Sequence, residues 1–385
     1  MMKLCVPTNW DNELIEGLAR INEKNHNIYE VFGSLPFGIV PGGRAPFGLP
    51  QVTREQAEEH IRLAKSKGIK FNYIMNAGSL MNQEYTIPGR SKISEYISWI
   101  VSAGADSITI GIPILLEHIK KKYPHVNVNI SVQGGVATPI EAKRFENLGA
   151  GRIVLRRRCN RDFKVLKEIK KAVKSDLCVF VNLDCINQCT MMFYHLSHPN
   201  HVCQNPNGSY VTYIDYPKIS CSLVKALDIV EFIKSRWIRP EDLKEYEALG
   251  IEYFKIIDRR MPTDKILKIV EAYSNQKYEG NLNDLFYYLP KPQVFLNQLK
   301  KKLPEAYEKI NGDVLSEIPV PTMQIDNKKL DGFLEFFKNH DCSSGCGDCN
   351  YCAEISKKVM KIENPQEFED YANALKKIKE EVSNL

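Results

Sequence analysis

Eight short β-rich runs alternate with helical patterns over the first two thirds of the chain, and this alternation limits the fold more than any other feature. Several runs, such as SITIGI and CVFVNL, are almost continuously apolar, which is typical of strands covered on both faces. Eight β/α units predict an α/β fold, a closed (β/α)₈ TIM-like barrel, rather than an open doubly wound sheet. The predicted strands are Leu4–Pro7, Ile28–Gly33, Lys70–Met75, Ser107–Gly111, Asn127–Val132, Arg152–Arg156, Cys178–Leu183 and Glu252–Ile257.

The helical segment after the fifth predicted strand shows how local sequence sets helix ends. Thr138 is a good N-cap residue, Pro139 suits the first helical position, and Glu141 completes a capping box. The segment is expected to end at Leu148, because Gly149 can adopt the left-handed conformation of a C-cap. Both ends of this helix are therefore predicted from sequence.

Two connections are too long to be plain links between a strand and a helix. Residues 35–51, rich in glycine and proline, follow the second predicted strand, and residues 184–221 follow the seventh. In a parallel barrel both lie at the C-terminal ends of the strands, where barrel enzymes carry their active sites. We expect long connections in such a position to be functional.

The β/α alternation stops near residue 278, where charged helical stretches at 293–302 and 365–383 take over. The chain is long enough for a barrel, which takes about 250 residues, together with a smaller unit. We predict a barrel over residues 1–277 and a small, mainly helical metal-binding domain over residues 278–385.

The cysteine content is high for the compartment that the rest of the sequence indicates. The N-terminus lacks a secretory apolar stretch and no run approaches the ~20 apolar residues of a membrane span, so we expect a cytoplasmic protein. Clustered thiols in a reducing compartment usually hold metal. Eight of the eleven cysteines form two groups, Cys185, Cys189, Cys203 and Cys221, then Cys342, Cys346, Cys349 and Cys352. The other three, Cys5, Cys159 and Cys178, adjoin apolar runs and are expected to be buried core residues.

The two cysteine groups differ in spacing. In the first group, CxxxC is followed by two distant cysteines, which favours a [4Fe-4S] cluster over the paired knuckles of zinc sites. The second, CSSGCGDCNYC, is denser, and Gly345 and Gly347 ease a tight wrap around a metal. Its consecutive spacing is ferredoxin-like, so a second [4Fe-4S] cluster is expected there, with structural zinc as the alternative.

Histidines lie between the second and third cysteines of the first group. His195, His198 and His201 are spaced i, i+3, i+6, which would bring them near one face of a helix. We take His195 and His198 as candidates that protonate or orient a substrate beside the metal. The alternative is a polar loop whose histidines contact only water.

Arginines and polar residues gather near the predicted strand ends. Arg156 and Arg157 close the sixth predicted strand, and Arg44 and Arg259 are expected at the same end of the barrel. Guanidinium groups there suit a dicarboxylate or phosphate, because their planar fork pairs with such anions; surface ion pairing is the alternative. Ser131 and Gln133 are the further candidates for substrate binding, because buried polar side chains at strand ends need partners.

The order of motifs from residue 104 to 260 resembles peptidase family U32, the collagenase-like peptidases. ISVQGG and IVLRRR are similar to the family's fifth and sixth strands, FVNLDC to its seventh strand with a first cysteine, and LGIEYFKIIDRRM to its signature. Gly43-Arg44-Ala45 stands where the family has an Arg-Ala pair. The CxxxC spacing, Ile257-Asp258 in place of Glu-Gly, and the C-terminal cysteine motif depart from the family pattern.

The resemblance implies an iron–sulfur enzyme. Characterised members bind a [4Fe-4S] cluster through four cysteines and are implicated in oxygen-independent hydroxylation of tRNA, rRNA or a ubiquinone precursor, with prephenate as the apparent oxygen donor. The substrate expected here is accordingly an RNA base, a quinone-like ring or a peptide, and an electron-donor protein is an expected partner. Protease activity is disfavoured, because the sequence contains neither a GxSxG elbow nor an HExxH helix.

A second hypothesis is a metal-stabilised accessory protein that binds RNA or peptide for a separate catalyst. The net charge of +5 permits an RNA partner without arguing for one. Basic stretches at 120–122 and 300–302 would be its footprint, although each is equally a solvated helix face. The oligomeric state is not readable from the sequence.

Overall fold

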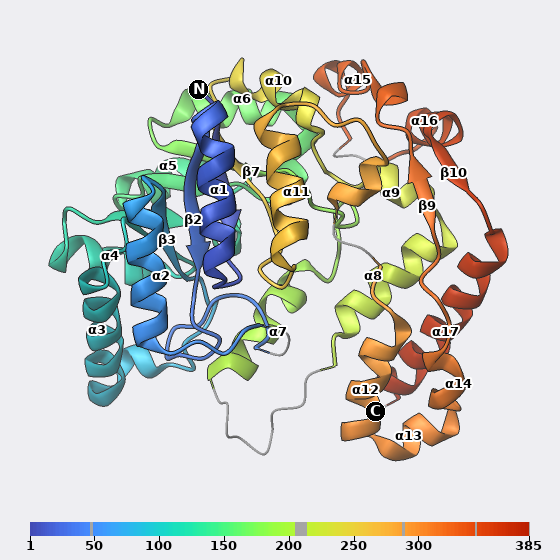
Figure 1. Cartoon of the computed structure of the whole chain (residues 1–385), viewed down its shortest axis with the longest axis horizontal. Coiled ribbons are helices and arrows are strands. Elements are labelled where there is room, and N and C mark those ends of the chain that lie inside the picture. Colours follow the sequence, from blue (N-terminus) through green and yellow to red (C-terminus); the bar gives the residue numbers. More distant parts are fainter. Residues whose placement is uncertain (47–48, 205–213, 287–288, 343–344, 385) are drawn as a thin grey trace.

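The computed structural model describes residues 1–46, 49–204, 214–286, 289–342 and 345–384. Eight parallel strands close into a barrel in chain order, with β1 paired to both β2 and β8, and helices surround it (Figure 1). The strands are β1 Lys3–Pro7, β2 Ile28–Gly33, β3 Lys70–Met75, β4 Ser107–Ile110, β5 Asn127–Ile130, β6 Arg152–Val154, β7 Asp176–Phe180 and β8 Tyr253–Lys255. The predicted (β/α)₈ barrel is confirmed.

Alternate residues of each strand face the barrel interior or the helix layer, as the pleat requires. On β2, for example, Val31 packs in the layer under the helices, whereas Phe32 belongs to a separate apolar cluster inside the barrel. The surrounding helices are α1 Asn12–Asn25, α2 Arg54–Ser66, α3 Ile87–Ser102, α4 Pro113–Lys122, α5 Pro139–Asn147, α6 Phe163–Ala172, α10 Leu243–Glu247 and α11 Thr263–Ser274.

Helix α5 has the ends that were predicted, with one change in its cap. The Thr138 hydroxyl accepts from the Glu141 backbone N–H at 3.3 Å, and Gly149 adopts a left-handed φ of 100°. The Glu141 carboxylate accepts from the Ala137 N–H at 2.7 Å instead of from the N-cap residue itself. The reciprocal half of the capping box is therefore shifted by one residue.

Several strands end earlier than predicted. The sixth stops at Val154, because residues Arg157–Arg161 wind into a short 3₁₀ helix, η3. The seventh runs from Asp176 to Phe180 instead of from Cys178 to Leu183. Arg156 and Arg157 consequently follow the strand, and η3 decides where their side chains point.

The long connection after β7 is largely helical. It contains α7 Met192–Gln204, α8 Tyr216–Leu227 and α9 Val230–Lys234. His195, His198 and His201 all lie on α7, and Cys221 lies on α8. The connection therefore forms a helical insertion beside the barrel.

The C-terminal region is mainly helical, as expected, and also contains a small antiparallel sheet of β9 and β10. Helix α17 packs along α8, and α16 packs against α9, so this region lies on the insertion (Figure 1). Its elements are α12 Pro292–Lys302, α13 Pro304–Lys309, α14 Gly312–Ser316, β9 Met323–Ile325, α15 Glu335–Asn339, α16 Tyr351–Val359, β10 Met360–Ile362 and α17 Pro365–Ser383. None of the helices in the described residues is long and apolar enough to span a membrane.

Candidate functional site

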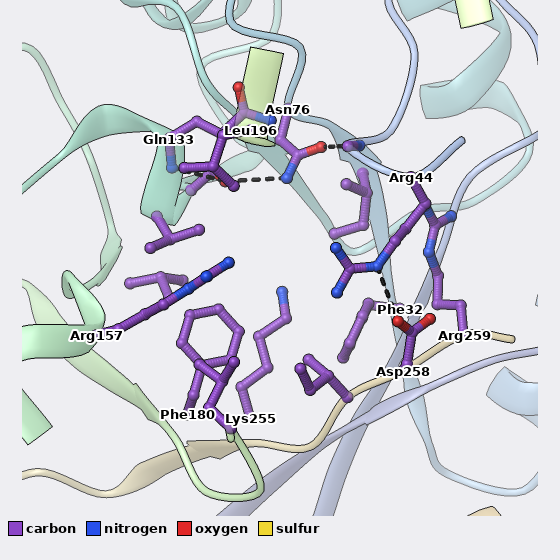
Figure 2. Close-up of a pocket in the computed structure, with 17 residues that line it drawn as sticks. Phe32, Arg44, Asn76, Gln133, Arg157, Phe180, Leu196, Lys255, Asp258 and Arg259 are labelled. Carbon is purple, nitrogen blue, oxygen red and sulfur yellow. Dashed lines mark hydrogen bonds and ion pairs between the residues drawn. The ribbon is translucent and has the colours of Figure 1, made fainter. Parts of the chain in front are cut away.

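A cavity opens at the C-terminal end of the barrel, and we call it the mouth cavity (Figure 2). Its floor and walls are mostly apolar, contributed by side chains such as Phe32, Ile74 and Phe180. Polar side chains from several strand ends converge on it: Arg44, Asn76, Ser131, Gln133, Arg157, Lys255, Asp258 and Arg259. The sequence-predicted candidates Arg44, Arg157, Ser131, Gln133 and Arg259 thus line one cavity.

Positive charge dominates the mouth cavity. Four of its lining side chains are cationic, Arg44, Arg157, Lys255 and Arg259, against one carboxylate, Asp258. That carboxylate is already paired, because its Oδ2 lies 3.1 Å from Arg44 Nε and 3.0 Å from Arg260 Nη2. The cationic side chains in excess of this one carboxylate are therefore available to bind an anion.

Burial shifts the pKa values of the acidic and the basic side chains of the cavity in opposite directions. Burial alone would raise the pKa of Asp258, but the charges of Arg44 and Arg260 hold it well below its usual range. Burial, followed by the neighbouring Arg44 charge, lowers the pKa of Arg259 to about 10. Burial also lowers the pKa of Lys255, whose ammonium lies 3.9 Å from the centre of the Phe32 ring. An anion in the cavity would relieve the desolvation of these cations.

Neutral polar groups complete one wall of the cavity. Asn76 donates to the Ser131 hydroxyl at 3.0 Å and accepts from the Gly43 N–H at 2.6 Å, which ties the 35–51 connection to the barrel. The Gln133 carbonyl oxygen accepts from Asn200 of α7 at 3.3 Å. In the part of the chain that the structure describes, the buried Gln133 amide nitrogen has no hydrogen-bond partner. It is a donor available to a ligand.

A second cavity adjoins the mouth cavity and is lined by thiols, so we call it the thiol cavity. Cys185, Cys189 and Cys221 line it together with His195. Arg157 lines both cavities, and its Nη1 lies 2.8 Å from the Cys185 sulfur. Residues 157–161 of η3 therefore hold a guanidinium at the boundary between an anion-binding cavity and a set of thiols.

A buried ion pair fixes the position of Cys221 relative to Cys185. Asp184, next to Cys185, lies 2.8 Å from Lys225 and 3.9 Å from Lys218, and these two lysines flank Cys221 on α8. Burial would raise the pKa of Asp184, but both lysines lower it. The pair fastens α8 against the end of β7, which brings the third thiol to the cavity.

Other predicted site residues lie at the edge of the two cavities. The Cys203 thiol is buried on α7 and donates to the Arg44 carbonyl at 3.0 Å, and it is not among the residues that line the thiol cavity. Arg156 lines a neighbouring hollow with Cys185 and Cys189, and its guanidinium lies 5.1 Å from the centre of the Phe193 ring. His198 stacks on Tyr194 with ring centres 5.4 Å apart. Of the α7 histidines, only His195 is among the residues that line the thiol cavity.

His195 is a neutral base in this setting. Its Nε2 lies 3.5 Å from Asp215 Oδ1, and burial lowers the pKa of the imidazole to about 4 in spite of that carboxylate. Burial likewise raises the pKa of Cys221 to about 11 and that of Cys203 to about 12. These two thiols are thus protonated unless a cation binds, which is ordinary for a thiolate site before metal enters.

The second cysteine group lines a hollow of its own in the C-terminal region. Cys342, Cys346, Cys349 and Cys352 face it together, and all four are free thiols. Gly345 and Gly347 have positive φ values of 97° and 43°, so the loop turns in conformations that favour glycine. All four cysteines of the second group therefore line one hollow, and the metal expected there stays a prediction.

The thiols that line the two hollows are ligands of the kind that iron–sulfur clusters and zinc ions use. Among the described residues, no group of three or more Cys, His, Asp or Glu side chains lies close enough to hold one metal ion. A cubane spreads its thiolates farther apart than a single ion does, because each thiolate bonds a different iron. Three thiols of the first group and all four of the second line a shared hollow, so the first set is one thiol short of the predicted four.

A string of three hydrogen-bonded groups, a hydroxyl, an imidazole and an amide, does occur in the structure and is of the kind that peptidases use. This string is buried. Thr8 Oγ1 lies 2.7 Å from His60 Nε2, and His60 Nδ1 lies 2.8 Å from Asn12 Oδ1. Thr8 and His60 are each only 1% exposed, so no peptide can reach the hydroxyl. The string joins the turn between β1 and α1 to α2, so its role is structural.

Several residues of the two cavities escaped the sequence prediction. Lys255 is the last residue of β8, Asp258 follows shortly after it, and both line the mouth cavity. Asn76 directly follows the third predicted strand, and Lys218 and Lys225 carried no signal beyond a helical pattern. Position after a strand end was a clue for Asn76 and Asp258 and gave none for Lys218 or Lys225, because burial and pairing partners come from distant parts of the chain.

A closed parallel barrel whose polar side chains meet at the C-terminal strand ends defines a TIM-barrel protein with its site where barrel enzymes carry theirs. Within that class, residues 42–279 match the model of peptidase family U32. The chain belongs to this family. The thiol cavity lies within the matched region, and the mouth cavity does so except for Phe32.

The individual relatives described next have low sequence identity to this chain. The chain is 28% identical over 352 residues to an uncharacterized protease of Methanocaldococcus jannaschii, covering 90% of this chain and 94% of the relative. The solved structure of a U32 peptidase has a TM-score of 0.49 and 16% identity, over 67% of this chain and 93% of that one. A tryptophan synthase α-subunit from Pyrococcus furiosus has a TM-score of 0.40 and 9% identity, over 74% and 99%.

Proposed function

We propose that this chain is an iron–sulfur enzyme that binds an anionic reactant in the mouth cavity and carries out an oxygen-independent hydroxylation or a related redox modification. The reactant that fits best is a carboxylate oxygen donor such as prephenate, and the group modified is an RNA base, a quinone-like ring or a peptide side chain. An electron-donor protein is the expected partner, and the cytoplasm the expected compartment.

One observation supports this proposal above the others. Arg157 lines both the cationic mouth cavity and the thiol cavity, with its guanidinium 2.8 Å from the Cys185 sulfur. A reactant held by that guanidinium would lie beside whatever the thiols bind. Proximity of this kind is what a reaction between a bound anion and a metal centre requires.

The protein side chains would bind and orient the reactant. Arg44, Arg157 and Arg259 present planar donors suited to carboxylates, and Lys255 adds a point charge from the barrel interior. Phe32 and Phe180 offer apolar faces to a ring, and the free Gln133 amide offers a hydrogen-bond donor. His195, neutral and beside the thiols, could accept a proton from the substrate.

Cys185, Cys189 and Cys221 would hold the cofactor at the thiol cavity. A [4Fe-4S] cluster bound there would supply one-electron redox chemistry and, at any iron without a thiolate, a Lewis acid. Cys203 donates to the Arg44 carbonyl, so it would need to turn away from that partner to become a fourth ligand. The C-terminal group, Cys342, Cys346, Cys349 and Cys352, would hold a second cluster or a zinc ion.

Peptide hydrolysis, which the family name suggests, has less support at the site. Among the described residues, no hydrogen bond joins His195 to a serine, threonine or cysteine side chain, and the Thr8–His60–Asn12 string is buried. An excess of cations around a cleft also contributes little to the hydrolysis of a neutral peptide bond. We expect the intact, metal-loaded protein to show no activity toward peptides in a peptidase assay.

The test is the metal content of protein purified without oxygen. We expect a brown protein with broad absorbance near ~400 nm and eight iron and eight sulfide per chain if both cysteine groups hold cubanes. Cys185→Ser should remove about half of the iron, whereas Cys203→Ser should remove less. A colourless protein that binds only zinc, at both groups, would refute the iron–sulfur proposal.

A further inference from the structure

A third hollow lies beside the thiol cavity, and we call it the arginine hollow. It is lined by four arginines, which come from η3 with the residue before it and from the segment after α9: Arg156, Arg157, Arg158 and Arg236. Among the described residues that line it there is no aspartate or glutamate. The arginine hollow therefore carries positive charge that its own lining does not balance.

The four guanidinium groups have few partners inside the protein. In the part of the chain that the structure describes, none of them forms an ion pair with a carboxylate. The buried Nε atoms of Arg156 and Arg157 have no hydrogen-bond partner among the described residues. Like charges gathered in one concave site repel one another and attract an anion.

Hydrogen bonds hold Arg236 next to the other three arginines. Asn160 of η3 donates to the Arg236 carbonyl at 2.8 Å, so the segment after α9 is fastened to the segment that carries the rest of the set. Arg236 Nε donates to Asn187 Oδ1 at 2.9 Å, and only 6% of Arg236 is exposed. Arg158, in contrast, is exposed. The hollow thus combines a buried, fixed guanidinium with one that solvent can reach.

An exposed aromatic ring lies next to this hollow. The Arg156 guanidinium lies 5.1 Å from the centre of the Phe193 ring, and Phe193, on α7, is 61% exposed. Tyr194, the next residue, is 53% exposed. Exposed aromatic rings beside arginines are the groups on which the bases of nucleotides and single strands stack. The surroundings of the hollow therefore suit an anion that also carries a planar ring.

A phosphate ester fits the arginine hollow better than a carboxylate does. A phosphate monoester carries a charge of about −1.5 to −2 at neutral pH and three strong acceptor oxygens, so several guanidinium forks can share it. The mouth cavity differs, because Asp258 and the Lys255 ammonium are among its lining groups. Arg157 lines both spaces and marks the boundary between them (Figure 2).

We propose that the arginine hollow binds the phosphate of a nucleotide, either free or as one unit of a nucleic-acid strand. Arg156, Arg158 and Arg236 hold the phosphate, and Phe193 stacks on the base. The site adds a ligand to the one proposed for the mouth cavity and requires neither the metal nor the reaction proposed there. Cys185 also lines the hollow, so a bound nucleotide lies beside the first cysteine group; only its role as the group to be modified rests on the proposed function.

The test is a calorimetric titration of the full-length chain, purified without oxygen, with adenosine monophosphate. Arg158→Met and Arg236→Met each remove one charged donor from the hollow, and we expect each to lower the affinity roughly 10-fold or more. Arg144→Met changes an exposed arginine of α5 that lines none of the three cavities and should bind as the wild type does. Arg158→Met should also keep its affinity for prephenate, because Arg158 does not line the mouth cavity.

Two further probes, inorganic phosphate and a single-stranded oligoribonucleotide of about six units, separate the parts of the ligand. Phe193→Leu should weaken the binding of adenosine monophosphate and of the oligoribonucleotide but leave that of inorganic phosphate unchanged. Tighter binding of the oligoribonucleotide, with an affinity that falls more steeply with salt, would identify a strand as the ligand. Equal affinities for the oligoribonucleotide and the mononucleotide would identify a free nucleotide.

Melting temperatures show whether each variant is folded, and the exposed Arg158 carries the test if the buried Arg236 cannot be replaced. A wild type that binds none of the three phosphate probes, or a folded Arg158→Met with unchanged affinity for adenosine monophosphate, would overturn the site. Iron is measured on the same samples. Variants that lose iron from the first cysteine group but keep the affinity for adenosine monophosphate would make the arginines partners of the metal instead. The iron content of the wild type tests the proposed function separately.

Discussion

At the scale of single residues, Arg157 connects the two halves of the candidate site. It lines the mouth cavity and touches the Cys185 sulfur, while Arg158, beside it in η3, is exposed. The difference follows from the turn of a short 3₁₀ helix, which sends successive side chains in different directions. Neighbouring arginines of one run, RRR, therefore have different roles.

Arg157→Lys keeps the charge at the mouth cavity but loses the planar fork. We expect dicarboxylate binding, measured by calorimetry with prephenate, to weaken by about 1–3 kcal/mol. Arg158→Lys is the matched control and should bind as the wild type does. Equal affinities of the wild type, Arg157→Lys and Arg158→Lys would mean that the anion does not contact Arg157.

His60 makes stability depend on pH. Burial lowers its pKa from 6.5 to about 4, so between these values the unfolded state binds more protons than the native state. Stability is therefore fully present above pH 6.5 and lost as the pH falls toward 4, by on the order of 2–3 kcal/mol. His60→Gln should flatten the melting temperature over this window, measured by calorimetry on the metal-free chain, and the exposed His125→Gln should not. A wild-type slope retained in His60→Gln would contradict the assignment.

At the scale of elements, the insertion after β7 determines which cysteines meet. Helix α8 carries Cys221 and is fastened to the end of β7 by Asp184 and Lys225, while α17 covers its other side. Helix α7 holds Cys203 against the 35–51 connection instead. Three of the four cysteines of this group therefore line the thiol cavity, whereas Cys203 does not.

Lys225→Met should release α8 from β7. The Asp184 carboxylate would stay buried with only Lys218, 3.9 Å away, and breaking a buried pair in this way costs about 3–5 kcal/mol. We expect a lower melting temperature and loss of iron from the first cysteine group, with the C-terminal metal retained. Lys171→Met, which removes an exposed pair with Glu168, should change neither quantity. Full iron at the first group in Lys225→Met would show that the pair does not position Cys221.

At the scale of the whole molecule, the barrel and the C-terminal region share one apolar core. Trp237, after α9, stacks between Phe286 and Phe333 with ring centres 5.3 and 5.5 Å away. Arg239 donates to the Asn327 carbonyl at 2.8 Å and pairs with Asp331 at 3.0 Å. These contacts cross the predicted boundary at residue 278 from the insertion to the C-terminal region.

We therefore expect the chain to unfold in one thermal transition rather than two. A truncated chain that ends at residue 277 would expose Trp237 and leave Arg239 with Asp242 alone, so it should melt at a lower temperature or aggregate. Differential scanning calorimetry of the full-length and truncated chains measures both effects. Two separated transitions, with the lower one absent from the truncated chain, would indicate independent domains.

The sequence by itself determined the barrel and the chemical character of the site. Strand and helix periodicity, caps such as Thr138, and the grouping of thiols are local patterns, and local patterns are readable without knowing what lies across the molecule. For the same reason the arginines after the strands could be expected at the barrel mouth.

Tertiary structure alone decided which of these groups meet. Whether Cys203 joins Cys185, whether Lys255 points inward, and which guanidinium faces which thiol depend on the packing of α7, α8 and η3. Those side-chain directions are set by partners dozens to hundreds of residues away, such as Asp184 for Lys225 and Ser34 for Arg259. Buried charges select their partners through desolvation and geometry, which no spacing along the chain encodes.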